Sequence, residues 1–236
     1  VYNFYAFNYL PDAPALGFVF MAWYYGFQFS LKGEKSALIK AFVFFTLGSL
    51  IKVTYLINPI AFIVYLIYLQ LFQKQAINAL LHRKSIFKWG AINLLLVASW
   101  NAYMLHYNQL YDSHSFNTSI LPIWDLNGEN ISQTWDYMIN FWYTSYFAHS
   151  SFHFLFVVFV FQIIYIKKSN YNLSWLTGLM FMGSVAFGLL FYAQFKDHDY
   201  YFLTFLPFFI LLIINGINTF KNISSELNHH RLVQAI

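Results

Sequence analysis

Cysteine is absent from this 236-residue sequence, and charged residues make up only 9% of it. Without cysteine, the chain can form neither a disulfide framework nor a thiolate metal site. P-loop, GxGxxG and GxSxG motifs and internal repeats are also lacking. Soluble domains contain about a quarter charged residues, so this chain cannot cover a water-facing surface. The composition therefore predicts a polytopic membrane protein.

Hydrophobic residues make up 59% of the chain, and its 29 Phe and 19 Tyr suit lipid-facing and interfacial surfaces. The hydrophobic residues are concentrated in runs that predict about seven membrane-spanning helices. The predicted spans are 13–29, 37–51, 58–72, 89–105, 152–166, 175–195 and 202–217. Several runs are shorter than the ~20 residues that a bilayer core requires. We expect flanking aromatic residues to extend these helices into the membrane interface.

The predicted fold class is all-α, a single transmembrane helical bundle over residues 1–236. One long polar stretch, residues 106–151, interrupts the hydrophobic pattern between the fourth and fifth predicted spans. It is rich in Asn, Ser, Trp and Tyr, and amphipathic aromatic segments of this kind lie along a membrane interface. We expect an extracytoplasmic, partly helical loop there.

Lysine and arginine are unevenly distributed between the two faces of the predicted bundle. If Asp12 is outside and the spans alternate, nearly all of these cations fall on the inner face. The positive-inside rule then fixes the orientation, and it accounts for the net charge of +4 without a nucleic-acid partner. Lys52 and Lys196 are the two exceptions, and they share the outer face with seven of the nine acidic residues.

The stretch from Lys196 to Tyr201 places a lysine, two carboxylates, an imidazole and two phenols between two hydrophobic runs. Charge at the edge of a membrane span is costly, and it usually marks a site or an anchor. Asp197-His198-Asp199 also matches the DxD pattern with which soluble nucleotide-sugar transferases hold a metal, but no α/β nucleotide-binding domain surrounds it. A metal or sugar contact and structural hydrogen bonding both remain open for these residues.

Two residues from the first predicted spans are expected on the same outer face. Asp12 lies between two prolines at the start of the first span. Its carboxylate could act in a cavity as a base, a metal ligand or a sugar contact, or it could cap the helix by accepting from free N–H groups. Lys52 ends the second span, and its ammonium, like that of Lys196, could bind a lipid phosphate or snorkel to the interface.

Three motifs occur in order on the predicted outer face: residues 9–16 (YLPDAPAL), 47–52 (LGSLIK) and 198–207 (HDYYFLTFLP). Together they resemble the polyprenyl-phosphate-dependent glycosyltransferases of the GT-C class. The branch they resemble holds the protein O-mannosyltransferases and the bacterial aminoarabinose transferases of lipid A. In that branch the three motifs are a Pro-Asp segment opening a mid-chain helix, a Leu-x-x-Leu-x-Lys helix end, and a His/Arg-x-Tyr-x-Leu-x-x-Leu-Pro start of a late helix.

The resemblance implies a membrane glycosyltransferase that moves a sugar from an undecaprenyl- or dolichyl-phosphate carrier to a glycan, lipid or protein acceptor. Transfer would occur on the extracytoplasmic side of a bacterial inner (plasma) membrane. The resemblance implies a catalytic role for Asp12, in the acceptor or metal site, and it leaves a divalent metal open. It implies contacts with the donor sugar or phosphate from six further residues: Lys52, Lys196, His198, Asp199, Tyr200 and Tyr201.

One part of the family pattern is missing from this sequence. The family's principal acidic motif, an Asp-Glu pair in the first extracytoplasmic loop, does not occur here. It would lie upstream of Val1, together with the first helices. We therefore expect the sequence to be an N-terminally truncated fragment that is inactive on its own.

Two other functional classes stay open at this point. A multi-span transporter or permease also combines many spans with few intramembrane charges, but its site lies near the middle of the membrane, often on broken helices related by repeats. A non-catalytic scaffold subunit of an export or polymerisation complex has no need for carboxylates and lysines gathered on one face. The one-sided distribution of polar groups favours the enzyme over both.

Overall fold

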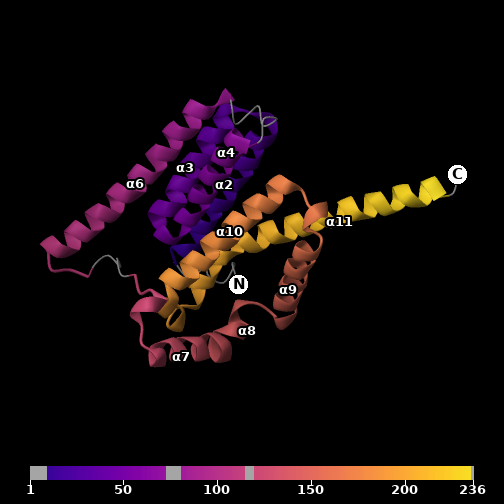
Figure 1. Ribbon diagram of the computed structural model, residues 1–236. Coiled ribbons are helices and arrows are strands. Elements are labelled where there is room, and N and C mark those ends of the chain that lie inside the picture. Colours follow the sequence, from indigo (N-terminus) through magenta and orange to yellow (C-terminus); the bar gives the residue numbers. More distant parts are fainter. Residues whose placement is uncertain (1–9, 73–80, 115–119, 235–236) are drawn as a thin grey trace.

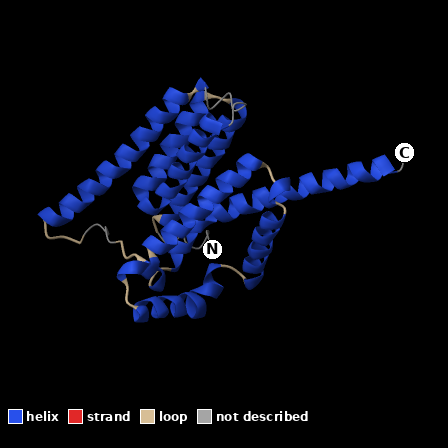
Figure 2. Cartoon of the chain, in the orientation of Figure 1, coloured by secondary structure: helices blue, strands red, loops and turns tan. Residues whose placement is uncertain are grey.

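The computed structural model describes residues 10–72, 81–114 and 120–234. These residues are almost entirely helical, and no strand occurs among them (Figure 2). The all-α prediction is therefore confirmed for this part of the chain. Tyr9, which begins the first of the three motifs, and residues 115–119 of the predicted loop lie outside the described ranges.

A helical hairpin forms the first part of the bundle. Helix α2 (Asp12–Lys32) follows Pro11, and a proline suits this position because the first helical turn has no acceptor for its backbone N–H groups. The helix ends at Gly33, whose left-handed conformation (φ 72°) lets its N–H bond to the Phe29 carbonyl at 2.8 Å. The chain then reverses, and α3 (Lys35–Ile51) runs back along α2.

The two helices of the hairpin approach each other closely at Gly48. A Cβ atom at this position would lie 3.0 Å from the Ala15 carbonyl oxygen and 3.1 Å from the Val19 side chain. A larger residue would therefore push α3 away from α2. The close contact sets the end of α3 beside the first turn of α2.

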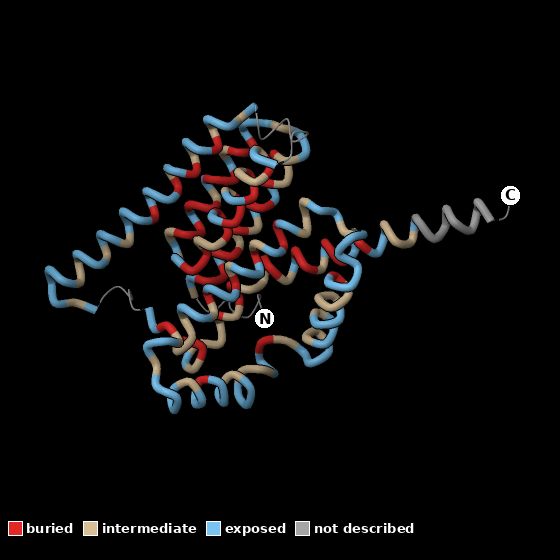
Figure 3. Tube along the Cα trace, in the orientation of Figure 1, coloured by how far each residue is buried: buried red, intermediate tan, exposed pale blue. Residues whose placement is uncertain are grey.

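The hairpin packs with the next two helices around an aromatic core. The short 3₁₀ helix η1 (Val53–Leu56) leads into α4 (Ile57–Phe72), and α6 (Arg83–Leu110) follows. Trp23 makes edge-to-face contacts with Phe45 and Phe62, with ring centres 5.4 and 5.7 Å apart, a preferred aromatic geometry. Buried residues are concentrated in this bundle, whereas residues 149–161 and the last turns of α6 are half-buried or exposed (Figure 3).

A segment between α6 and α9 lies across the end of the molecule (Figure 1). We call residues Gly128–Tyr146 the crosswise segment. It turns by 98° into α9. Its elements and neighbours are the 3₁₀ helix η2 (Ile123–Asp125), α7 (Gly128–Tyr137), the π-helical turn η3 (Met138–Trp142), α8 (Tyr143–Tyr146) and α9 (His149–Ile164).

The last two long helices complete the fold. Helix α10 (Tyr171–Leu190) packs on α4, where the Tyr68 and Trp175 rings lie 5.1 Å apart, and α11 (Leu206–Gln234) packs on α9 and α10. The elements in order are η4 (Ile166–Lys168), α10 (Tyr171–Leu190), η5 (Tyr192–Lys196), η6 (Asp199–Phe205) and α11 (Leu206–Gln234). The two 3₁₀ helices η5 and η6 together connect α10 to α11.

Every predicted span is occupied by helix, but fewer helices are long and apolar enough to cross a membrane. In the part of the chain that the structure describes, three stretches qualify: Val53–Phe72, Tyr171–Leu190 and Asp199–Ser225. A fourth is present if the crosswise segment and α9 count as one broken span. The chain is thus a helical protein with several helices capable of crossing a bilayer.

The boundaries of the sixth predicted span, 175–195, differ from those of α10. The helix begins earlier, at Tyr171, because the Asn170 side chain accepts a hydrogen bond from the Leu173 N–H at 3.0 Å and so caps it. It ends earlier too, at Leu190, where the backbone tightens into η5. Both differences arise from local hydrogen bonding that hydrophobicity does not reveal.

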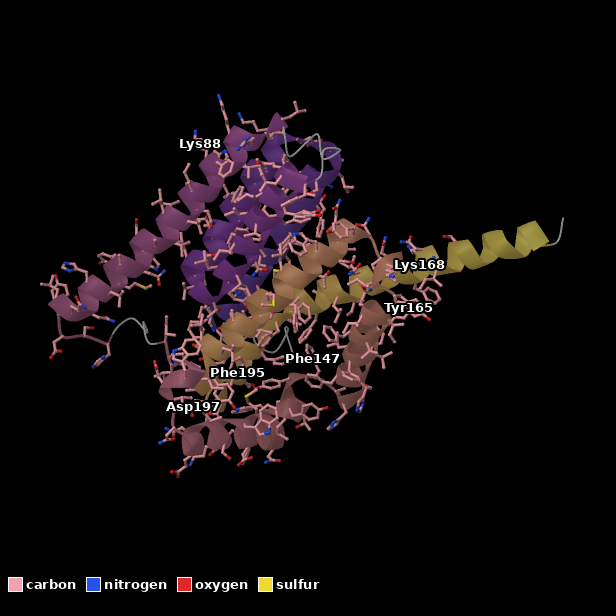
Figure 4. The ribbon with its side chains drawn as sticks, viewed as in Figure 1. Lys88, Phe147, Tyr165, Lys168, Phe195 and Asp197 are labelled. Atoms are coloured by element: carbon pink, nitrogen blue, oxygen red, sulfur yellow. The ribbon has the colours of Figure 1, made fainter. Side chains whose placement is uncertain are left out.

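Ring contacts show which helix ends lie together. Phe29 near the end of α2 contacts His82 just before α6 at 5.8 Å, and Tyr68 near the end of α4 contacts Tyr171 at the start of α10 at 6.2 Å. Figure 4 places Lys88 and Asp197 at opposite ends of the molecule. We call the turns before α3, α6 and α10, with the adjoining helix ends, the basic turns; their cations are Lys32, Lys35, Arg83, Lys84, Lys88, Lys167 and Lys168.

Candidate functional site

Asp12 and Lys52 form an ion pair at the end of the bundle opposite the basic turns. Lys52 Nζ donates to Asp12 Oδ1, and the two residues are 40 positions apart in the sequence. The Asp12 side chain is fully buried, and that of Lys52 is 12% exposed. Two of the residues predicted for the outer face are therefore in direct contact.

The end of α3 places Lys52 against the start of α2. The Lys52 N–H still bonds to the Gly48 carbonyl at 3.0 Å, but its backbone is extended (φ −147°, ψ 115°), so the helix stops here. The chain then begins a new helical turn in η1. Because Gly48 holds α3 close to α2, the Lys52 side chain reaches the Asp12 carboxylate.

Two tyrosines from η6 cover the ammonium of Lys52. Lys52 Nζ lies 4.0 Å from the centre of the Tyr201 ring and 4.7 Å from that of Tyr200. The His198 ring stacks on Tyr201 at 5.5 Å and lies 5.0 Å from Tyr200. An ammonium near aromatic faces is attracted by the ring quadrupoles. Lys52 is thus held between one carboxylate and two aromatic rings.

A chain of hydrogen bonds supports the ion pair from within the bundle. The Tyr55 hydroxyl donates to the backbone carbonyl of Asp12 at 3.3 Å, and Asn58 Nδ2 donates to the Tyr55 carbonyl at 3.1 Å. Trp23 Nε1 in turn donates to Asn58 Oδ1 at 2.9 Å. All these side chains are buried. The first turn of α2 is therefore fixed to η1 and α4.

The hydroxyls of Thr54 and Thr204 connect the two sequence-distant parts of the site. They lie 3.4 Å apart and both residues are buried. Thr54 belongs to η1, which follows Lys52, and Thr204 belongs to η6, which contains the two tyrosines. This contact sets the position of the rings relative to the ammonium.

The ion pair is placed where it adds little to stability. Burial lowers the pKa of Lys52 below its ordinary value of 10.5, and the attraction to Asp12 offsets this only in part. Asp12 Oδ2 is buried without a hydrogen-bond partner. Replacing a buried ion pair by apolar residues is often neutral or stabilising. Natural proteins tolerate such local violations chiefly at functional sites.

The geometry is suited to binding an anion. The Lys52 ammonium is a compact point charge of the kind that binds phosphate. Its one carboxylate partner occupies one side, and the Tyr200 and Tyr201 rings form an aromatic wall on another. His198 and Asp199 are half-buried at the edge of this wall. A phosphate could therefore meet a cation whose position is already fixed.

Lys196 lies apart from this group. Its Nζ donates to Gln133 Oε1 of α7 at 2.9 Å and lies 5.5 Å from the Tyr137 ring. The Trp142 indole N–H donates to the Lys196 backbone carbonyl at 3.0 Å. The structure thus brings Asp12, Lys52, His198, Tyr200 and Tyr201 together and places Lys196 against the crosswise segment.

The stretch Asp197-His198-Asp199 does not gather metal ligands around itself. Asp197 is exposed, whereas Asp199 is half-buried at the start of η6. Among residues 10–72, 81–114 and 120–234, no three His, Asp or Glu side chains are arranged to hold a metal ion. The described residues therefore give the DxD match no geometric support.

Several supporting residues were not identified from the sequence. Asn58 is a polar residue within an apolar run, and this is a signal that could have found it. Tyr55 follows Lys52 by three positions, close enough in a helical turn to share its surroundings. Trp23 and Gln133 lie far from the motifs in sequence, and only the packing of α2 and α7 identifies them.

Comparison with known proteins gives no relative for this arrangement. No protein-family model, no curated protein and no solved structure matches the chain. The geometry and charge of the Asp12–Lys52 pair and its two tyrosines are therefore the basis for assigning a function.

Proposed function

We propose that this chain is part of a membrane glycosyltransferase that moves a sugar from a polyprenyl-phosphate carrier to an acceptor hydroxyl on the extracytoplasmic face. The observation that supports it most directly is the Lys52 ammonium, buried between Asp12 and the Tyr200 and Tyr201 rings. A fixed cation near the edge of apolar helices fits the phosphate of a lipid carrier. The three motifs of the GT-C resemblance contain these four residues.

Sugar transfer requires a proton acceptor and a stabilised leaving group. The acceptor oxygen attacks the anomeric carbon, and the bond between that carbon and the phosphate oxygen breaks. The phosphate leaves with the bonding electron pair, and Lys52 stabilises the resulting charge. The proton of the acceptor hydroxyl passes to a carboxylate.

The burial of Asp12 fits a positioning role better than that of the base. Its Oδ1 atom is held by Lys52 and its side chain is fully buried. We therefore assign Asp12 to fixing the Lys52 ammonium. Asp199, half-buried beside Tyr200, is the candidate within the described residues for accepting the proton.

The basic turns support an orientation in which the ion pair faces away from the cytoplasm. They lie at the end of the bundle opposite Asp12 and Lys52, as the positive-inside rule requires for an extracytoplasmic site. In this proposal α2, α3 and α6 cross a bacterial plasma membrane beside the more apolar helices, giving about seven spans. The crosswise segment, at 98° to α9, lies along the outer surface.

A transfer assay tests the proposal. The full-length protein is reconstituted in vesicles with radiolabelled polyprenyl-phosphate sugars, and release of label from the carrier is followed. We expect Lys52→Ala to reduce transfer by roughly a hundredfold, because the leaving phosphate loses its cation. Lys88→Ala, at the opposite end of the molecule, is the matched control and should leave transfer unchanged. Transfer by Lys52→Ala at the wild-type rate, or no transfer from any lipid-linked donor, would overturn the proposal.

A transporter is the second candidate, and one observation favours it. Taken together, the crosswise segment and α9 are long and apolar enough to form one membrane span, which a 98° bend interrupts. Discontinuous helices of this kind are typical of transporter sites. Solute uptake by the same vesicles, without movement of label from the lipid carrier, would support this second function.

A further inference from the structure

Four exposed cations lie together at the basic-turn end of the bundle. We call them the four-cation patch; they are Lys32, Lys35, Arg83 and Lys84. The first two flank the turn between α2 and α3, and the last two begin α6. Phe29, near the end of α2, contacts His82, just before α6, with the ring centres 5.8 Å apart. The two pairs of cations are therefore neighbours, although they are far apart in the sequence.

The positive charge of the four-cation patch is not neutralised by the described residues. Within residues 10–72, 81–114 and 120–234, no ion pair joins any of these cations to a carboxylate. The first turns of α3 and α6 contain no acidic residue. Lys35, Arg83 and Lys84 thus lie where the helix dipole disfavours a cation. An anion bound here would offset both the mutual repulsion of the cations and the unfavourable dipole.

One exposed face of α6 changes from charged to apolar immediately beyond the patch. Phe87 and Leu94 follow Lys84 on this face, three and ten residues later, and all three side chains are exposed. Arg83 Cζ lies 5.9 Å from the centre of the Phe87 ring, at the boundary between the two parts. A lipid with an anionic headgroup and an acyl chain matches this order of surfaces. A nucleic acid or a run of acidic residues has no apolar part to place there.

We propose that the four-cation patch binds the headgroup of an anionic phospholipid with two phosphates, a lipid of the cardiolipin type. The cations come in two pairs on separate elements, so one phosphate contacts the pair at the α2–α3 turn and the other contacts the pair at the start of α6. An acyl chain lies along Phe87 and Leu94. Basic pockets between membrane helices on the cytoplasmic side bind headgroups of this kind.

The lipid site is separate from the Asp12–Lys52 pair, which lies at the opposite end of the bundle. It requires that the bundle lies in a bilayer, and it does not depend on the proposed transfer of a sugar. Its test therefore measures lipid binding and stays informative whether or not the full-length protein transfers sugar.

A lipid titration tests the site. The full-length protein is held in detergent micelles, tetraoleoyl cardiolipin or dioleoyl phosphatidylglycerol is added at equal phosphate concentration, and bound lipid is counted by native mass spectrometry. We expect the apparent Kd per phosphate to be about tenfold lower for cardiolipin, because its two linked phosphates engage both pairs of cations at once. Equal affinity for the two lipids would overturn the proposal.

A double variant with a matched control separates this site from a general attraction to anionic lipid. Arg83→Gln with Lys84→Gln should weaken cardiolipin binding roughly tenfold. Lys167→Gln with Lys168→Gln removes the same charge from two exposed cations of another basic turn, and this pair should leave binding unchanged. Figure 4 shows Lys168 well apart from Lys88, which belongs to the start of α6. Equal weakening by the two double variants would show a diffuse attraction to the whole basic end, and the proposal would be wrong.

Two further measurements examine the chemistry of the occupant. Arg83→Lys with Lys84→Arg exchanges the two cations and keeps their charge, so binding should stay within about twofold of the wild type. A tenfold loss in this variant would contradict an electrostatic site. Polyglutamate at equal total charge should not displace bound cardiolipin, because it has no acyl chain to lie along α6. Displacement would identify an acidic protein segment as the better occupant and would also overturn the proposal.

Discussion

The ammonium of Lys52 lies 4.0 Å from the centre of the Tyr201 ring and donates a hydrogen bond to Asp12 Oδ1. The ring therefore covers a cation that is also ion-paired, and water has little access to either charge. Substitutions at these positions should affect stability and anion binding to different degrees.

Removing one charge of the buried pair should be more harmful than removing both. Lys52→Met leaves the Asp12 carboxylate buried without a counter-ion, and we expect a loss of about 3–5 kcal/mol in the free energy of unfolding. The double variant Asp12→Asn with Lys52→Met should recover most of this loss, yet remain inactive in transfer. Thermal unfolding in detergent measures the first effect and the vesicle assay the second. A single variant as stable as the wild type would contradict the burial of the pair.

The aromatic character of Tyr201 should matter more than its hydroxyl. Tyr201→Leu removes the ring beside the Lys52 ammonium, and we expect a cost of about 0.5–2 kcal/mol from the lost cation–π attraction. Tyr201→Phe keeps the ring and should stay close to the wild type in unfolding and in transfer. If the phenylalanine variant were as impaired as the leucine variant, the hydroxyl and not the ring would be the important group.

Transfer should decline at high pH because Lys52 must be protonated to bind phosphate. Its pKa is lowered by burial from the ordinary 10.5, so the charge is lost at a lower pH than for an exposed lysine. The unfolded chain holds this proton more tightly than the folded state does, so the free energy of unfolding rises with pH through this titration and unfolding does not cause the decline. Rates measured between about pH 7 and 11 should show the fall. In Lys52→Arg the side chain stays charged, so the decline in the transfer rate should move to higher pH.

Gly48 should be required for the contact between α2 and α3. In Gly48→Ala the new Cβ would lie 3.0 Å from the backbone oxygen of Ala15, and we expect a loss of about 1–3 kcal/mol from overpacking. Gly128→Ala is the matched control, because among the described residues its added Cβ meets nothing within 4 Å apart from its own stretch of chain. The unfolding midpoints of the two variants are measured and compared. Equal midpoints would show that α3 can shift without a loss in the free energy of unfolding.

The crosswise segment should detach locally when its contacts with η5 are removed. Trp142→Phe deletes the indole N–H that donates to the Lys196 carbonyl at 3.0 Å, at a cost of about 1 kcal/mol. Hydrogen exchange should quicken in α7 and α8 but not in α2 or α3. Trp135→Phe, at an exposed tryptophan of the same segment, should leave exchange unchanged. Faster exchange throughout the bundle would mean that the segment is part of the global core.

Hydrophobic runs predicted the long helices well because each of these helices contains a long apolar run. They located α4 closely, since Asn58-Pro59 marks the start of that helix in the sequence and in the structure. They placed the start of α10 too late because the cap at Asn170 is a side-chain interaction of a polar residue. The crosswise segment was predicted as a partly helical loop, but its 98° bend depends on packing that no local pattern encodes.

Charge placement predicted part of the candidate site for a physical reason. A cation or a carboxylate at the end of an apolar run is rare, and this identified Asp12 and Lys52 independently. Their direct pairing required the close approach at Gly48, which is a property of the fold. Lys196 had the same sequence signal but binds Gln133, because its position in η5 directs it to α7.

The contact between Thr54 and Thr204 joins residues 150 positions apart, and this separation matters for biosynthesis. Asp12 and Lys52 precede η6 in the sequence, so the residues of the ion pair are translated before the aromatic wall. A ribosome that stalls before η6 releases a chain in which the ammonium has its carboxylate but no covering rings. In such a product the Lys52 ammonium lacks its contacts with the Tyr200 and Tyr201 rings, so the covering of this cation is completed only when η6 packs on the earlier helices.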